Sequence, residues 1–228
     1  MDKIVRGIAG EGQIRCFAME STQLVEEARQ HHNTTPVGHR CVRVDGLCPH
    51  DSDLLTLKID CSGPVKGLTV TADAKGNVKG FPLVPQVSLP ASPARKLDVG
   101  RAVDLGVLTV IRDTGLKEPY SGTINLVSGE IAEDLTYYFA ASEQTPSSVA
   151  LGVLMNKNNT VKKSGGYIIQ LMPDASDEII DTLETRLKHL DPVTTLLSNG
   201  HTPESMLKLI LEGLDPELMD EMPAQFYC

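Results

Sequence analysis

The apolar residues of this chain follow two different spacings, and the change between them at Pro173 is the feature that most constrains the fold. Before Pro173, short runs rich in Val, Ile and Leu are separated by Gly, Pro, Asn or Asp, as is typical of strands joined by turns. After Pro173, Leu and Ile recur at the spacing of helices. We therefore predict a strand-rich, mixed-sheet α+β domain with packed helices over residues 1–173, followed by a helical linker arm over residues 174–222.

Turn and capping residues place the elements of the predicted first domain. Gly10-Glu11-Gly12 predicts a hairpin, because two short apolar runs flank it. Ser21 or Thr22 is predicted to cap a helix that runs to about His32, and the helical period of residues 130–141 predicts another helix. The predicted strands are residues 3–8, 12–18, 54–59, 66–72, 77–83, 106–111, 119–127, 148–155 and 166–172.

The predicted arm carries two apolar helical faces. The first runs from Ile179 to Leu190, with charged residues between its apolar positions. The second belongs to a helix predicted to start at Thr202-Pro203-Glu204, where Pro takes the first helical position. Asp215-Pro216-Glu217 predicts the start of a further short helix for the same reason.

The charge of the chain excludes two classes of partner. Its 228 residues carry a net charge of -9 and give a pI near 5.1. Nucleic-acid binding needs a basic surface, and attraction to an anionic membrane needs clustered Lys and Arg, so neither partner is expected. No apolar run approaches the roughly 18 residues of a membrane span, and the first residues lack the apolar stretch of a signal peptide. We predict a soluble, cytoplasmic protein.

Five cysteines are present, and their odd number and irregular spacing do not indicate a disulfide framework. In the polar stretch after the first predicted helix, His39, Cys41, Cys48 and His50 supply two Cys and two His, the donors of a tetrahedral zinc site. Their spacing fits none of the standard patterns of zinc ligands, so chance accumulation in a loop is the competing interpretation. A small metal-binding module at residues 39–50 is kept as an alternative hypothesis.

The motifs of ATP-binding phosphate loops, hydrolase nucleophile elbows and zinc proteases are all absent from the sequence. Glu130, Glu133 and Asp134 are close enough on one predicted helix to suggest acid–base chemistry. The competing interpretation is that acidic residues in a first helical turn complement the helix dipole. Composition and spacing favour no enzyme class, and we predict that the protein is not an enzyme.

Several segments carry a more specific signal. They are GPVKG at 63–67, KLDVGRAV at 96–103, SGEIAEDLTYYF at 128–139, SEQTPSS at 142–148, GGYIIQLMP at 165–173 and MPAQFYC at 222–228. In this order they closely resemble the 33 kDa redox-regulated chaperonin family, known as heat shock protein 33. The resemblance covers nearly the whole chain except residues 37–53.

The resemblance implies a bacterial, cytoplasmic, ATP-independent holdase that binds unfolding proteins and prevents their aggregation under oxidative and heat stress. It implies an α+β domain, a helical linker and a small zinc domain, with a homodimer as the active form. In the family, four cysteines arranged C-x-C and C-x-x-C bind zinc when reduced. Their oxidation releases zinc, unfolds the linker and exposes apolar surface to clients. It implies unfolded or partly unfolded client proteins as partners, with no single client-binding residue to name.

The chain departs from the family at its end. Cys228 matches the first zinc cysteine, and the sequence stops there. Because one thiolate does not hold a tetrahedral zinc ion, residues 223–228 are expected to be the start of a zinc domain that is otherwise missing. We expect no zinc binding, no family-type redox switch and no ATP requirement in this chain. Cys228 is the one site residue nominated, as a remnant metal ligand.

A second departure lies at residues 37–53, where the family carries a longer apolar helical segment. The Arg, Cys, His and Gly content of this stretch resembles a translated wrong reading frame with a net deletion, which sequencing of the encoding DNA tests. Losing several buried side chains costs on the order of several kcal/mol. An inactive fragment with a damaged core is therefore the third hypothesis, beside the holdase and the metal-binding module.

Overall fold

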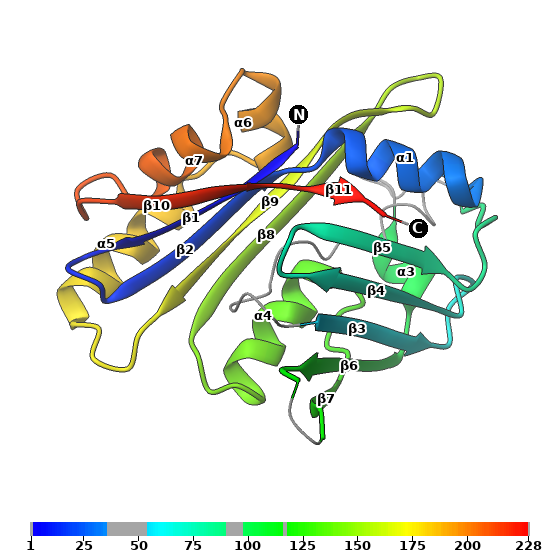
Figure 1. Cartoon of the computed structure of the whole chain (residues 1–228), viewed down its shortest axis with the longest axis horizontal. Helices are drawn as coiled ribbons and strands as arrows, with labels where there is room; N and C mark the ends of the chain where they lie inside the picture. Colours follow the sequence, from blue (N-terminus) through cyan, green and yellow to red (C-terminus); the bar gives the residue numbers. More distant parts are fainter. Residues whose placement is uncertain (1, 36–53, 90–97, 116–117, 228) are drawn as a thin grey trace.

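The computed structural model describes residues 2–35, 54–89, 98–115 and 118–227, which form two β-sheets with helices packed against them (Figure 1). The five-stranded sheet is antiparallel throughout. Its strands, in spatial order, are β10 (Glu217–Pro223), β1 (Lys3–Ala9), β2 (Ile14–Glu20), β9 (Val161–Leu171) and β8 (Ser147–Met155).

The six-stranded sheet is mixed, because its edge strand β11 runs parallel to β5 while all other neighbours are antiparallel. Its strands, in order, are β11 (Gln225–Phe226), β5 (Asn77–Pro82), β4 (Gly67–Asp73), β3 (Leu54–Cys61), β6 (Gly106–Asp113) and β7 (Tyr120–Asn125). The helices are α1 (Thr22–His32), α3 (Val99–Val103), α4 (Ile131–Ala141), α5 (Asp177–Lys188), α6 (Val193–Ser198) and α7 (Pro203–Ile210). The predicted α+β class with a mixed sheet is confirmed.

Two apolar clusters share the five-stranded sheet, one on each of its faces. The first lies between this sheet, α1, α4 and the six-stranded sheet, and it contains Ile4, Met19 and Ile168. The second lies between the opposite face and the helices α5, α6 and α7. Figure 1 shows these three helices on one side of the five-stranded sheet and the six-stranded sheet on the other. Because both faces are covered, β9 is buried along most of its length.

Backbone conformation explains the hairpin between β1 and β2. Gly10, Glu11 and Gly12 all have positive φ angles, of 57°, 56° and 86°. Glycine adopts this region without strain, so two glycines in three residues allow the chain to reverse tightly. The predicted hairpin is confirmed, and its strands pair from Lys3 with Glu20 to Ala9 with Ile14.

The first helix begins where predicted, but its cap differs. Ser21 occupies the cap position without a side-chain cap hydrogen bond, because its hydroxyl lies 3.0 Å from that of Ser164. The carboxylate of Asp2 caps the helix instead, because it accepts a hydrogen bond from the Leu24 amide in the first turn at 2.7 Å. The start of α1 is therefore tied to the N-terminal strand and not to its own capping residue.

The prediction of a helix starting at Asp215-Pro216-Glu217 is wrong. Asp215 has a φ of 46°, in the left-handed region, so the chain turns there. Glu217–Pro223 then forms β10, which pairs with β1 across more than two hundred residues of sequence. A local pattern typical of a helix start was overridden by this long-range strand pairing.

The domain boundaries at residues 173 and 222 stay predictions. The stretch 36–53, with the proposed frame error and the candidate ligands His39, Cys41, Cys48 and His50, lies outside the described residues. Within the described ranges, no helix is long and apolar enough to cross a membrane.

Candidate functional site: the arm interface and an open groove

The helices α5, α6 and α7, which we call the arm helices, cover a closely packed apolar face of the five-stranded sheet. Met206, Leu207 and Ile210 on α7 are all 0% exposed, and so are Ile14 and Cys16 on the strand beneath them. Two residues fix where α7 begins. The Thr202 hydroxyl caps the helix, and Pro203 occupies its first position, which suits proline. The apolar face predicted for this helix is therefore buried against the sheet. On α5, by contrast, only Leu183 of the predicted face is buried.

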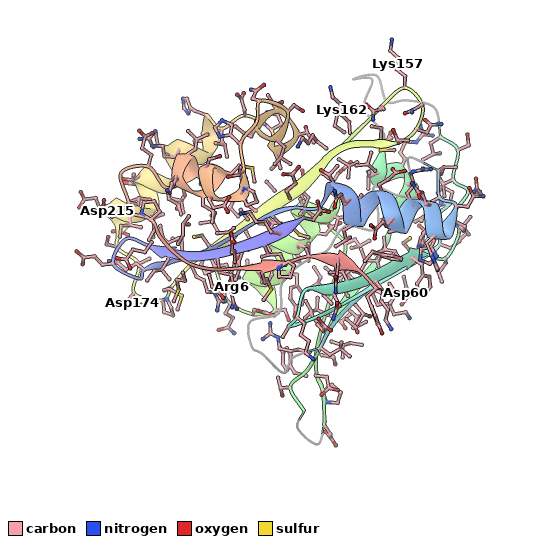
Figure 2. All side chains as sticks on the ribbon, turned by 45° about the horizontal axis from the view of Figure 1, so that its top comes forward. Arg6, Asp60, Lys157, Lys162, Asp174 and Asp215 are labelled. Atoms are coloured by element: carbon pink, nitrogen blue, oxygen red, sulfur yellow. The ribbon has the colours of Figure 1, made fainter. Side chains whose placement is uncertain are left out.

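Charged side chains at the surface hold β10 beside β1. Lys3 pairs with Glu221 at 2.8 Å and also with Glu204 at the start of α7. Arg6 pairs with Asp220, with Nε donating to Oδ1 at 3.0 Å. Figure 2 shows Arg6 beside β10. Exposed ion pairs contribute about 0–1 kcal/mol each, so these pairs add little to the backbone pairing of β1 with β10.

In two of these pairs, those of Asp220 and Glu204, the pKa of the carboxylate lies below its usual range. The hydrogen bond from Arg6 lowers the pKa of Asp220. Burial raises the pKa of Glu204, but hydrogen bonds from Lys3 and Thr202 outweigh it and bring the pKa to about 2. Both carboxylates are therefore charged at neutral pH, when the attachment is fully formed.

An open groove lies on the face of the sheet away from the arm helices. It has a volume of about 400 Å³, and the apolar side chains Ile8, Phe17 and Met219 line it. Met219 is 69% exposed. The guanidinium of Arg15 lies 5.6 Å from the centre of the Phe17 ring, a cation–π distance. An apolar floor with charged groups at its rim suits an extended segment that carries apolar side chains.

The edge strand β8 offers a second kind of surface. It is the last strand of its sheet and pairs, among the described strands, with β9 alone. Its sequence SSVALGVLM is uncharged and largely apolar. One amide of β8, that of Val149, donates to the Thr136 hydroxyl of α4 at 3.3 Å. Edge strands can accept a strand from another chain where their backbone groups are unpaired. This edge is therefore a candidate contact for an unfolded segment or for a second copy of the protein.

The nominated site residue Cys228 lies outside the described residues, as do Cys41 and Cys48. The two described cysteines do not fit a zinc site. Burial raises the pKa of Cys16 to about 12, which keeps it a thiol, whereas zinc binds thiolates. Cys61 is half-buried at the end of β3. Among the residues described, no three His, Cys, Asp or Glu side chains are grouped to hold a metal ion.

The acidic residues at the start of α4 have structural contacts. Asp134 is 0% exposed and accepts hydrogen bonds from the amides of Val127 at 2.7 Å and Ser128 at 3.1 Å. Glu130 accepts one from the Gly100 amide at 3.2 Å. These bonds fix the loop that enters the helix, which favours the structural interpretation over acid–base chemistry.

Sequence reasoning missed the groove and the β10 attachment. Alternation along β1 and β2 marks Arg6, Ile8, Arg15 and Phe17 as one face of a hairpin, and this signal could have found half of the groove. Met219 could not be found in the same way, because it enters only when β10 pairs with β1.

Comparison with known proteins finds similar sequences over the whole chain. The family model described as Hsp33 protein matches residues 2–228. The 33 kDa chaperonins of Agathobacter rectalis and Lachnoclostridium phytofermentans are 52% and 53% identical to this chain, over all of it and over 82% and 80% of their own lengths. These alignments span 235 residues, so the relatives carry residues that have no counterpart in this chain of 228.

A solved structure agrees with the arrangement of the sheets. The crystal structure of the 33 kDa chaperonin, a heat shock protein 33 homologue, from Thermotoga maritima matches with a TM-score of 0.90 and 30% sequence identity. The match covers 99% of this chain and 80% of that one. The sequence resemblance, the family match and the shared fold agree, and this chain belongs to the Hsp33 family of chaperones.

Proposed function

We propose that this protein is an ATP-independent holdase that binds unfolding proteins and prevents their aggregation under heat and oxidative stress. The observation that carries the proposal is the arm interface. Fully buried apolar side chains, among them Leu207 and Ile210, face a fully buried sheet surface. At its far end the arm is attached by β10, which is mostly exposed and held partly by ion pairs.

Release of the arm helices exposes two apolar surfaces at once. The side chains of α7 and the sheet face beneath them lose their mutual cover, and large exposed apolar patches bind other apolar surfaces. Burying one Leu or Ile side chain contributes about 1.5–3 kcal/mol, so a client with several such residues binds without any nucleotide. The open groove supplies a smaller apolar surface before release.

The remaining parts of the proposal follow the same division of the chain. We assign client binding to residues 1–173, the covering arm to residues 174–222 and the beginning of a zinc domain to residues 223–228. The β8 edge is the surface we propose for a homodimer, and we propose a cytoplasmic location. Clients are unfolded or partly unfolded proteins, and neither nucleic acid nor a membrane is a partner.

A reversible clamp tests whether arm release exposes the client surface. Arg6 and Asp220 are opposite each other in the β1–β10 register, so the pair Arg6→Cys and Asp220→Cys places two thiols across the strands. The disulfide closes in the oxidised protein and opens with reductant. Light scattering of a thermally unfolding client, without ATP, measures the suppression of aggregation.

We expect the clamped protein to suppress aggregation less than the same protein after reduction. The wild type and the single variant Arg6→Cys, taken through the same oxidation and reduction, control for the other cysteines and for loss of the ion pair. Equal suppression by clamped and reduced protein would place the client surface elsewhere. No suppression by the wild type at near-stoichiometric amounts would refute the holdase itself.

A further inference from the structure

The last described strand, β11, is attached to the protein by few backbone contacts. The amide of Gln225 donates to the Gly76 carbonyl at 2.9 Å, and that of Tyr227 donates to the Val78 carbonyl at 2.9 Å. Strand β11 has only two residues. Figure 1 shows it between α1 and β5. With so short a ladder, the docking of β11 depends on what its side chains contact.

Phe226 of β11 packs into a cluster of aromatic rings at the end of α1. Its ring centre lies 5.6 Å from that of His31 and 6.0 Å from that of His32. His32 also lies 6.1 Å from Phe81 of β5, and the two imidazoles are 4.9 Å apart in an edge-to-face arrangement. Two titratable rings therefore form part of the side-chain contact that holds the strand. The rest includes a hydrogen bond from Nε2 of Gln225 to Oδ1 of Asn77 at 2.6 Å and the packing of Phe226 against the first apolar cluster.

The surroundings of His32 favour its neutral form. Its Nε2 atom is buried without a hydrogen-bond partner among the described residues, and burial, followed by the neighbouring His31, lowers its pKa. The charged groups on the elements packed against it are Glu26, Glu27 and Arg29 of α1 and the exposed Lys79 of β5. Of these, Arg29 and Glu26 pair with each other at 2.6 Å. Strand β11 carries no ionisable side chain.

We propose that His31 and His32 form a pH-sensitive latch that holds β11 against β5 and releases it on acidification. When the ring of His32 carries both protons, Nε2 is a buried donor with no acceptor among the described residues, and the charged ring lies beside a second imidazole. Undocking of β11 relieves both penalties, because water then reaches the ring. The latch concerns only the attachment of residues 225–227 and is independent of the holdase proposal.

The direction and size of the effect follow from linkage. Because the pKa of His32 is lower when β11 is docked, docking is strongest above the ordinary histidine pKa of about 6.5 and weakens as the pH falls below it. For one proton taken up between pH 7.5 and pH 5.5, the fraction of open strand rises by at most about tenfold.

Hydrogen exchange of the full chain tests the latch. The amides of Gln225 and Tyr227 report on docking directly, since both donate to β5 or its preceding turn. After correction for intrinsic exchange, we expect their protection to fall several-fold, up to about tenfold, from pH 7.5 to pH 5.5 in the wild type. His32→Phe keeps an aromatic ring against Phe226 and should remove this dependence.

The matched control is His189→Phe, which changes an exposed histidine at the end of α5 and should keep the wild-type dependence. Protection that stays constant at pH 5.5 would overturn the proposal. Protection that increases at pH 5.5 would also overturn it, because an attraction between the imidazolium and the aromatic rings would then dominate. A full pH dependence retained in His32→Phe would overturn it as well. A direct NMR titration of His32 in the wild type stands independently of any variant, and a pKa above 6.5 would also refute the latch.

Discussion

Leu207→Ala tests the arm interface most directly. The Leu207 side chain is 0% exposed on α7, within the apolar cluster that faces the five-stranded sheet. Replacing a fully buried Leu by Ala costs about 2–5 kcal/mol, depending on how far the surrounding side chains close the cavity. In a chain of this size each kcal/mol shifts the melting temperature by roughly 2–4 °C. We therefore expect Tm to fall by roughly 4–20 °C.

The same substitution has a functional consequence if the arm is the cover of the client surface. A loss of about 2 kcal/mol from the arm interface raises the released fraction about thirtyfold, as long as release remains rare. At a temperature where both proteins are folded, Leu207→Ala should therefore suppress client aggregation at a lower ratio of chaperone to client than the wild type. Calorimetry and light scattering measure the two effects.

The matched control is Leu105→Ala, because Leu105 is 74% exposed and its truncation should change stability by less than about 0.5 kcal/mol. A Tm drop below 2 °C in Leu207→Ala would contradict the packing of the arm. A large Tm drop without stronger suppression of aggregation would show that the surface under α7 is not where clients bind.

Other substitutions test the local arguments. Asp2→Ala removes the acceptor of the buried Leu24 amide and should cost about 1–3 kcal/mol in denaturant unfolding at pH 7. Asp2→Asn should cost less than half of that, for two reasons. It keeps an oxygen that accepts the hydrogen bond, and it removes a buried charge. Burial raises the pKa of Asp2, so the charged carboxylate lowers the stability of the folded protein as the pH rises through that pKa. Asp134→Ala leaves two loop amides without their acceptor. In the same assay it should lower the free energy of unfolding by about 1–3 kcal/mol. A double-mutant cycle on Arg6 and Asp220 should give a coupling of about 1 kcal/mol or less that shrinks with added salt; a salt-independent coupling would contradict an exposed pair. A single cooperative thermal transition of the whole chain is expected, whereas a broad melt would favour the hypothesis of a damaged core.

Local patterns predicted the elements whose formation depends on neighbouring residues. The hairpin at Gly10-Glu11-Gly12 and the helix that became α4 lie within a residue or two of their predicted bounds. By contrast, β9 starts at Val161, five residues before the predicted strand. The prediction missed this start because Lys162 and Lys163 interrupt the apolar pattern there. The strand exists there because it pairs with β8.

The sequence by itself determined the α+β class, the apolar stripes of the arm and, through its specific segments, the family. These properties depend on residues that are close in the chain, or on segments that match the family in the same order. No three-dimensional contact is therefore needed to predict them. The tertiary structure alone decided that Glu217–Pro223 is a strand, that Met219 joins Phe17 in one groove, and that Phe226 meets the histidines of α1. The physical reason is that these contacts join residues about two hundred positions apart, where the free energy of strand pairing and ring packing outweighs local preference.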